Sequence, residues 1–436
     1  MTKRNWMRAA VAALAALLSC MIILNIAKSE ELTAAKMRIS AVYEKAFYET
    51  CELTEAISAN YRKLLVAGDN AQMQVLLGEI SRQTQGAASN LALLPLGEET
   101  ISATIKFINQ AEDFAETLSA KIAANETVSE EDYAAMETLS ESAAKFSVGL
   151  LKLLERYERG EAVFDAEDYA ETGRESLYPL TGDAAQYPVL LYDGPFSDGE
   201  AVGDYSMLNG AKEFTQAEAE ARLRAFIPVE EITFTGSSHP EVDCYEFRVV
   251  SGGVSISAGV TKPGGHILYL LPETEVDKVN YTPDQLCDMA LAFLISRGYG
   301  SMEMSYYSAY GGILTINFAA VQNGVVLYPD LLKLQLSMET GQVIGLDAHN
   351  YLRNHRERSI PAPAITAEEA MLRISPRLKA NAARLCIIPQ NRAEYFCYEI
   401  AASDSSGDFL VYVDAQTGVE RDLMQVISRD NGTLVM

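Results

Sequence analysis

Three similar units occupy the second half of the chain, and this repetition constrains the fold more than any other feature of the sequence. Each unit begins with a threonine and a helix-like stretch that has an acid or amide in its first turn, the pattern of a capping box. Sequence with the alternating polarity of β-strands comes next, and then a glycine turn. The threonines are Thr215, Thr282 and Thr366, and the glycines, at intervals of 77 positions, are Gly264, Gly341 and Gly418. The repetition predicts three tandem modules, each with one helix on an antiparallel sheet.

The first part of the chain has a different pattern. Between residues 29 and 175, apolar residues recur every three or four positions, which is typical of amphipathic helices. Four such stretches can be distinguished, and the fourth begins after Ser129, a suitable N-cap ahead of three acidic residues. The short connections between the stretches predict a four-helix bundle or a pair of helical hairpins.

These patterns together predict an α+β chain with an N-terminal membrane anchor, an all-α helical bundle and three helix-plus-antiparallel-sheet modules. A length of 436 residues suits two to four domains of ordinary size. The expected boundaries are a cytoplasmic start and transmembrane anchor at 1–28, a helical domain at 29–175, a connecting segment at 176–210, and modules at 211–275, 276–350 and 351–436, the last of which includes a linker.

The anchor prediction depends on one apolar run near the N-terminus. Residues 9–27 form a run of 19 apolar-dominated positions, enough to cross a bilayer core of roughly 30 Å as a helix. Lys3, Arg4 and Arg8 precede the run, so the positive-inside rule places the start in the cytoplasm and everything after the run outside. A cleaved signal peptide and a lipoprotein signal around Cys20 are the alternatives.

The charge of the chain excludes one large class of partners. Lys and Arg total 35 and Asp and Glu total 60, which gives a formal net charge of −25. Binding to a phosphate backbone requires clustered Lys and Arg, so nucleic-acid binding is not expected. The acids fall mostly at helix starts and on the polar faces of the predicted helices, and we interpret them as solvated surface.

No catalytic set emerges from the residue pattern. HExxH, GxSxG, P-loop and Rossmann fingerprints are missing from the sequence, and we expect no enzyme activity, no metal site and no cofactor. The six cysteines lack zinc-site spacing; buried free thiols are the main interpretation, and a disulfide between Cys386 and Cys397 is the alternative. His349 and His355 are interpreted as linker residues rather than metal ligands. Because a glycosidase needs only two carboxylates, a cell-wall hydrolase remains a minor hypothesis.

One segment before the repeats is distinctive. Residues 187–198 run from an apolar extended piece into Asp-Gly-Pro, a strong turn signal. One interpretation is a strand and turn packed against a neighbouring domain. The other is a partner-binding surface that presents aromatic side chains beside a rigid turn. The candidate partner-binding residues are Tyr187, Pro188, Tyr192, Asp193, Gly194, Pro195 and Phe196.

Several short motifs in the chain resemble those of a known family. The last glycine turn, from Asp414 to Val419, has the sequence D-A-Q-T-G-V and resembles the closing hairpin of PepSY domains; residues 338–343 resemble it without the leading Asp-Ala. The D-G-P-F-S-D of residues 193–198 and the Y-L-R-N-H-R-E-R of residues 351–358 make the whole arrangement similar to the YpeB family of spore-germination proteins. In that family a His commonly follows the motif, whereas Gly199 stands here.

This resemblance implies a non-enzymatic role in endospore-forming bacteria. It implies that the chain supports the assembly, localisation or stability of a spore cortex-lytic hydrolase of the SleB type. It further implies residence in the inner spore membrane, with a single span and an extracytoplasmic C-terminal bulk. Because PepSY domains are also associated with the restraint of peptidases, an extracytoplasmic sensor or inhibitor with a protease as its partner is the alternative.

Overall fold

The computed structural model describes residues 28, 37–38, 41–94, 98–159, 196, 205–237, 242–273, 278–390, 392–405, 407–429 and 432–435. The chain forms two compact units: the first consists of Met1–Tyr61 with Leu77–Pro188, and the second of Arg62–Leu76 with Val189–Met436. Within the described ranges, no helix has both the length and the apolar character needed to span a bilayer. The predicted anchor at 1–28 lies outside the described residues, apart from Lys28.

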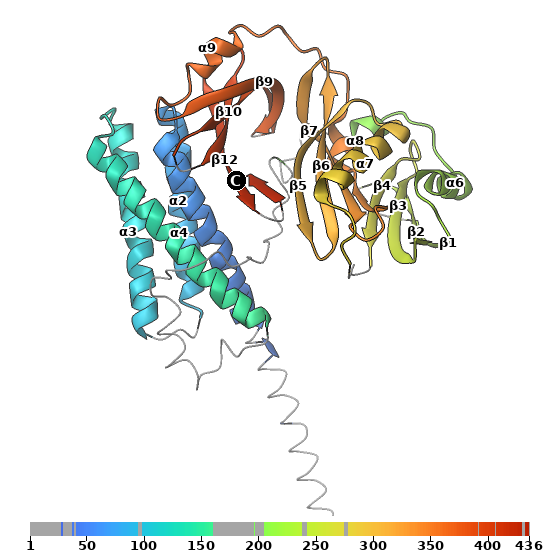
Figure 1. Cartoon of the computed structure of the whole chain (residues 1–436), viewed down its shortest axis with the longest axis horizontal. Coiled ribbons are helices and arrows are strands. Elements are labelled where there is room, and N and C mark those ends of the chain that lie inside the picture. The colour runs from blue at the N-terminus through green and yellow to red at the C-terminus, as the bar shows by residue number, and fades with distance from the viewer. Residues whose placement is uncertain are drawn as a thin grey trace, which may run out of the picture. The chain divides into compact units, whose positions relative to one another are not determined.

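The first unit contains the predicted helical bundle except for Arg62–Leu76, which belongs to the second unit. Helical residues occur at 41–66, α2 (Asn70–Leu91), α3 (Glu98–Ala123) and α4 (Glu130–Glu158) (Figure 1). The predicted N-cap of α4 is confirmed, because the Ser129 hydroxyl accepts a hydrogen bond from the Asp132 amide at 3.3 Å. The bundle core contains a buried Tyr61, whose hydroxyl donates to the Ala111 carbonyl at 2.7 Å.

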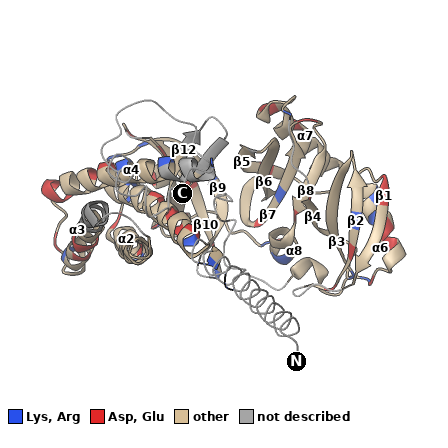
Figure 2. Cartoon of the chain, turned by 90° about the horizontal axis from the view of Figure 1, so that it is seen from below, with Lys and Arg blue, Asp and Glu red and all other residues tan. Residues whose placement is uncertain are grey.

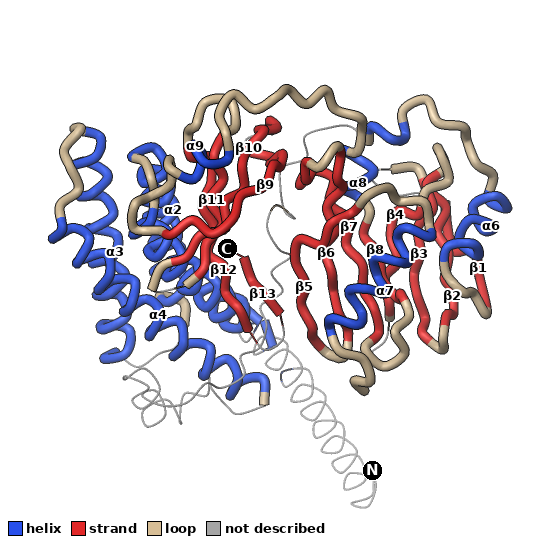
Figure 3. Tube along the Cα trace, turned by 45° about the horizontal axis from the view of Figure 1, so that its top comes forward, coloured by secondary structure: helices blue, strands red, loops and turns tan. Residues whose placement is uncertain are grey.

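The second unit repeats one element order three times, a helix followed by four strands (Figure 3). The first group comprises α6 (Gln216–Phe226), β1 (Glu231–Gly236), β2 (Cys244–Ser251), β3 (Val254–Thr261) and β4 (Ile267–Pro272). The second comprises α7 (Pro283–Ser296), β5 (Met302–Tyr310), β6 (Ile313–Gln322), β7 (Val325–Ser337) and β8 (Val343–Asp347). The third comprises α9 (Ala367–Met371), β9 (Lys379–Gln390), β10 (Ala393–Ser403), β11 (Asp408–Asp414) and β12 (Glu420–Arg429). Three further elements are η1 (Ser206–Leu208), α8 (His349–Asn354) and β13 (Gly432–Val435).

The helices of these groups begin where the capping threonines predict. At Thr215, Thr282 and Thr366 the threonine hydroxyl accepts a hydrogen bond from the amide three residues later, and the Glu or Gln at that position accepts one from the threonine amide. Each reciprocal pair satisfies two of the amides that a helix start leaves without an intrahelical partner.

The predicted glycine turns have the expected backbone conformation. Gly264, Gly341 and Gly418 have φ values of +81°, +72° and +75°, in the left-handed region that glycine enters without a Cβ clash. Each turn joins the third and fourth strands of its group. At the divergent first turn, Gly265 also has a positive φ of +62°, and a Cβ there would lie 2.4 Å from the Phe214 ring.

The strands that the structure describes belong to one 13-stranded sheet in the order β1-β2-β3-β4-β8-β7-β6-β5-β13-β12-β11-β10-β9. Neighbours in this order are antiparallel, and β7 makes an additional parallel pairing with β9 through Val326 and Leu327. A second pairing that matters for the topology joins β13 to β5, at Gly432 and Ser308. These two pairings close the eight strands β5–β7 and β9–β13 into a ring.

The core of the second unit consists of two apolar clusters. The larger one joins α6 and α7 to the strands of the first two groups, through side chains such as Leu223, Leu286 and Leu334. The smaller one lies among the strands of the ring and includes Tyr328, Cys386, Cys397 and Tyr412. Cys386 and Cys397 are paired residues across β9 and β10, and both are buried free thiols, the main interpretation of their sequence context.

The acidic residues are spread over the helices of both units in Figure 2. Among the described lysines and arginines, exposed ion pairs such as Arg248 with Glu273 and Lys212 with Glu218 join neighbouring surface residues. This distribution fits the interpretation of the negative charge as solvated surface.

Candidate functional site: a buried polar junction

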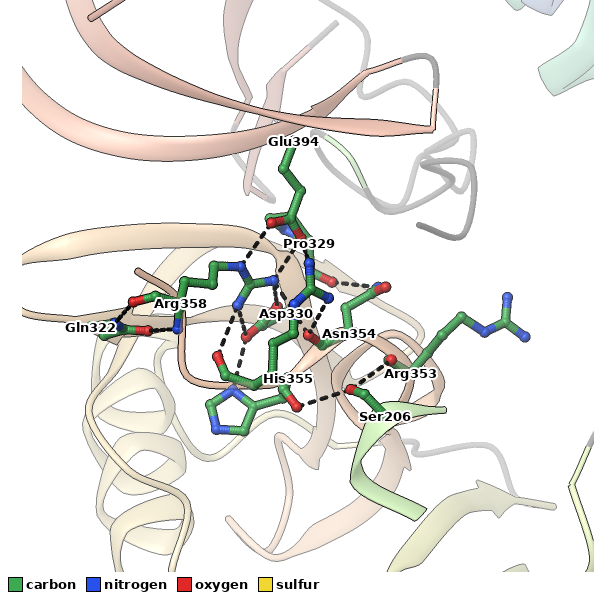
Figure 4. Close-up of polar contacts among 10 residues, drawn as sticks. Ser206, Gln322, Pro329, Asp330, Arg353, Asn354, His355, Arg358 and Glu394 are labelled. Atoms are coloured by element: carbon green, nitrogen blue, oxygen red, sulfur yellow. Dashed lines mark hydrogen bonds and ion pairs between the residues drawn. The ribbon is translucent and has the colours of Figure 1, made fainter. Parts of the chain in front are cut away.

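A buried carboxylate and a buried guanidinium join β7 to the segment after α8 (Figure 4). The Asp330 side chain is 0% exposed and the Arg358 side chain is 6% exposed. Arg358 donates from Nη1 to Asp330 Oδ2 at 2.9 Å and from Nη2 to Oδ1 at 2.7 Å. This bidentate arrangement matches the planar fork of arginine to both oxygens of the carboxylate.

The same guanidinium also binds Glu394, the second residue of the third group's strand β10. Arg358 Nε donates to Glu394 Oε2 at 2.9 Å, and Nη2 donates to Oε1 at 2.8 Å. Arg356 adds an ion pair to Glu394 at 3.2 Å. Arg358 therefore connects β7 of the second group with β10 of the third.

The backbone around Arg358 is held by neighbouring side chains. Gln322 donates to the Arg358 carbonyl at 2.6 Å and accepts from the Arg358 amide at 2.9 Å. The Asn354 amide group donates to the Pro329 carbonyl at 2.9 Å, and the Nδ1 atom of His355 lies 2.8 Å from Asp330 Oδ2. These contacts fix the segment from Asn354 to Arg358.

The electrostatics of the junction favour a permanently charged arginine. Burial alone would lower the pKa of the Arg358 guanidinium, but its hydrogen bonds to Glu394 and Asp330 outweigh burial, and the pKa lies above its ordinary value. The four carboxylate oxygens of the two acids accept from the guanidinium. These hydrogen bonds hold β7, the segment after α8 and β10 together, which is a structural role.

A second polar network crosses the ring of strands nearby. Glu399 of β10 accepts from Arg384 Nε of β9 at 2.7 Å and from the Tyr328 hydroxyl of β7, and Arg384 Nη2 donates to the same hydroxyl at 3.0 Å. Arg384 also pairs with Glu303 of β5. Burial, then the charge of Glu399, raise the pKa of Tyr328 well above its ordinary value, so its hydroxyl stays protonated as a donor.

Phe196 is the one described residue of the predicted partner-binding segment. Its ring packs against Tyr328, with centroids 5.0 Å apart, and against Tyr412, with centroids 5.3 Å apart. The Tyr412 hydroxyl is buried and has no hydrogen-bond partner in the described part of the chain. Phe196 itself is half-buried against these two rings. The other candidates, Tyr187, Pro188, Tyr192, Asp193, Gly194 and Pro195, lie outside the described residues.

Sequence reasoning did not identify Asp330, Arg358 or Glu394 as a unit. The useful signal was the motif at 351–358, which contains Arg358 and whose His355 contacts Asp330. The linker interpretation also fits His349, whose Nδ1 lies 2.7 Å from Asp347 Oδ1. Over the described positions, no group of three or more His, Cys, Asp or Glu side chains is placed to hold a metal ion.

Comparisons with known proteins match both units of the chain. Residues 31–166 match the family profile described as YpeB N-terminal, and residues 174–361 match the profile described as YpeB sporulation, PepSY1 and PepSY2 domains. The chain is 23% identical over 395 residues to a Sporulation protein YpeB of Halalkalibacterium halodurans, covering 87% of this chain and 88% of that protein. It is 22% identical over 410 residues to a Sporulation protein YpeB of Bacillus subtilis, covering 90% and 91%.

A solved structure is also similar to part of the chain. The Bacillus megaterium YpeB C-terminal domain aligns with a TM-score of 0.47 at 25% sequence identity. The alignment covers 50% of this chain and 100% of that domain.

Proposed function

Because the chain belongs to the YpeB sporulation family, we propose that it is a membrane-anchored accessory protein of spore germination. In this proposal it is not an enzyme, and it supports the assembly, localisation or stability of a cortex-lytic hydrolase of the SleB type. Residues 1–28 hold it in the inner spore membrane by a single span, and the rest of the chain lies on the extracytoplasmic side.

The observation that carries the proposal is the match of both the helical region and the first two sheet modules to one sporulation family. The buried junction is consistent with it. Arg358, Asp330 and Glu394 satisfy one another instead of presenting reactive groups to a cavity, as expected of a protein that acts through its surfaces.

The proposal extends the PepSY description to the third group of elements. The matched profile ends at residue 361, before α9. The third group nevertheless has the same capping box and the same glycine turn as the first two, at Thr366 and Gly418. We therefore include 351–436 as a third PepSY-like module.

Deletion of the gene from its host tests the proposal. We expect dormant spores without the protein to contain much less of the cortex-lytic hydrolase in their inner-membrane fraction, with the transcript of the hydrolase unchanged. Restoring the full gene should restore the hydrolase, and a gene lacking codons 2–28 should not. A normal amount and location of the hydrolase in the deletion spores would overturn the proposal.

Affinity capture separates this function from a sensor or inhibitor of a peptidase. Capture of the tagged chain from spore membranes should recover the hydrolase. Recovery of a protease without the hydrolase would favour the alternative. Release of muropeptides from cortex by the purified chain would instead show an enzyme, and we expect no release.

A further inference from the structure

A pocket of about 430 Å³ lies between the first two groups of the second unit. Its walls come from α6, from the turn between β3 and β4, from the end of α7, and from η1 and α8. This volume is within the range of roughly 300–1,000 Å³ that is usual for small-molecule sites. Arg358, Asp330 and Glu394 do not line the pocket, but its Tyr351 ring stacks on the His355 ring, with centroids 4.4 Å apart, and so adjoins the junction.

The charged residues that line this pocket are all basic. Arg222 and Arg297 are present and no Asp or Glu contributes to the lining, although the whole chain has a net charge of −25. Neither arginine is ion-paired with a carboxylate among the residues that the structure describes. Arg297 uses Nε to donate to the Phe226 carbonyl at 2.6 Å and Nη1 to donate to Ser296 at 3.1 Å, which leaves its Nη2 group available.

Two tyrosines add hydroxyl donors to the same pocket. Tyr299 and Tyr351 both line it, with ring centroids 5.2 Å apart. Neither hydroxyl bonds another described residue, although Tyr351 is only 5% exposed. Burial, then the charge of Asp330, raise the pKa of Tyr351 to about 12, so this hydroxyl remains a donor at neutral pH.

The remaining walls are largely apolar, and they indicate the shape of a ligand. Buried side chains of Phe226, Ile267 and Leu352 line the pocket together with the half-buried Met207. An inorganic anion would leave this apolar surface uncovered, whereas an organic acid would cover it. His266 also lines the site; burial, then the charge of Arg222, lower its pKa, which favours the neutral imidazole.

We propose that this pocket binds a carboxylate attached to an aliphatic or aromatic body. The carboxylate accepts from Arg222, Arg297 and the tyrosine hydroxyls, and the body packs on the apolar wall. Charge-assisted hydrogen bonds of this kind are about twice as strong as neutral ones. A free organic acid and the C-terminus of a peptide share this chemistry.

Titration calorimetry of the full chain in a non-ionic detergent tests the proposal with matched probes. The acids are 3-phenylpropanoate and acetyl-Ala-Ala-Phe with a free C-terminus, and the controls are their amides and inorganic phosphate. We expect at least one acid to bind with a Kd below about 1 mM, and its amide to bind at least about tenfold more weakly. Binding should weaken as salt is added. The acid that binds more tightly identifies the source of the carboxylate.

Variants test the assignment of residues. Arg222→Gln and Arg297→Gln should each weaken binding of the acid about tenfold, and Tyr351→Phe several-fold. Arg224→Gln is the matched control, because Arg224 lies on the same helix but pairs with Glu220 and does not line the pocket. Among the described residues Arg222 makes no hydrogen bond and only a cation–π contact with Phe214, 5.7 Å from the ring centroid, so its variant remains informative if Arg297→Gln destabilises the chain. Equal binding of acid and amide, phosphate binding alone, or unchanged binding by the Arg222 variant would overturn the proposal.

Discussion

Arg358 is a charged side chain that is almost fully buried, and two carboxylates offset the free-energy cost of removing its charge from water. Asp330 and Glu394 together accept four hydrogen bonds from its guanidinium. Removing one member of such a group leaves an uncompensated buried charge, which costs far more than the loss of an exposed ion pair. The contribution of the junction to the free energy of unfolding therefore depends mainly on Arg358.

We expect Arg358→Met to destabilise the second unit by about 3–5 kcal/mol, because Asp330 stays buried without its counter-charge. Urea unfolding followed by circular dichroism measures the change. The control is Arg248→Met, which removes an ion pair whose side chains are 58% and 38% exposed and should cost no more than about 1 kcal/mol. Equal unfolding midpoints for the two variants would contradict this account.

Asp414 contributes a pH dependence to stability. Burial alone would raise the pKa of its carboxyl, but hydrogen bonds from Arg421 and from the amides of Gln416 and Thr417 outweigh burial and lower it. Its stabilisation is therefore present above the unfolded pKa of about 4 and is lost as the pH falls through the lower folded value. Asp414→Asn should cost about 1–3 kcal/mol at pH 6. In thermal unfolding, the difference in stability between the variant and the unsubstituted chain should be smaller at pH 3 than at pH 6. The same difference at both pH values would argue against this role of Asp414.

At the scale of elements, the glycine turns at Gly341 and Gly418 differ in the residue that leads them. Asp414 accepts from two turn amides at 2.9 Å. Ser337 occupies the equivalent position 77 residues earlier, and its hydroxyl accepts from the Glu339 and Thr340 amides at 3.3 Å. The turn at Gly341 therefore keeps the hydrogen-bond pattern although it lacks the aspartate, which the motif alone did not show.

Gly418→Val should destabilise the last module by about 1–3 kcal/mol, because a β-branched residue resists the φ of +75° found there. A Cβ at this position would meet Arg373 at 3.6 Å, an ordinary contact, so the cost lies in the backbone. Gly78→Ala, in the exposed middle of α2 with nothing within 4 Å, is the opposite control and should stabilise by about 0.5–1 kcal/mol. An unchanged melting profile for the Gly418 variant would refute the turn assignment.

Local sequence patterns predicted the elements better than their connections. The capping boxes at Thr215, Thr282 and Thr366 are formed within four residues, so the sequence specifies them directly. The parallel pairing of β7 with β9 depends on strands about 60 positions apart, at Val326 and Cys386, and leaves no local pattern. The junction could not be predicted for the same reason, because its residues are far apart in the sequence. Nothing distinguishes Asp330 and Glu394 from the other acidic residues until the fold brings them together.

At the scale of the whole molecule, the charge has an uneven distribution along the sequence. The first 28 residues contain four basic residues and no acid, while the rest of the chain carries the net negative charge. We expect the full chain to float with lipid vesicles in a density gradient and a chain of residues 29–436 to remain at the bottom. If the shortened chain floats equally well, the membrane contact belongs to another part of the protein.

The ring of eight strands determines when the second unit can become complete during synthesis. Its closing pair joins Ser308 to Gly432, residues 124 positions apart. Until residues 432–435 emerge, β5 and β12 each have an unpaired edge that can bond to another extended chain. Pairings of this sequence separation also form slowly. A chain that ends shortly before residue 432 would have every module present and two sheet edges open to aggregation.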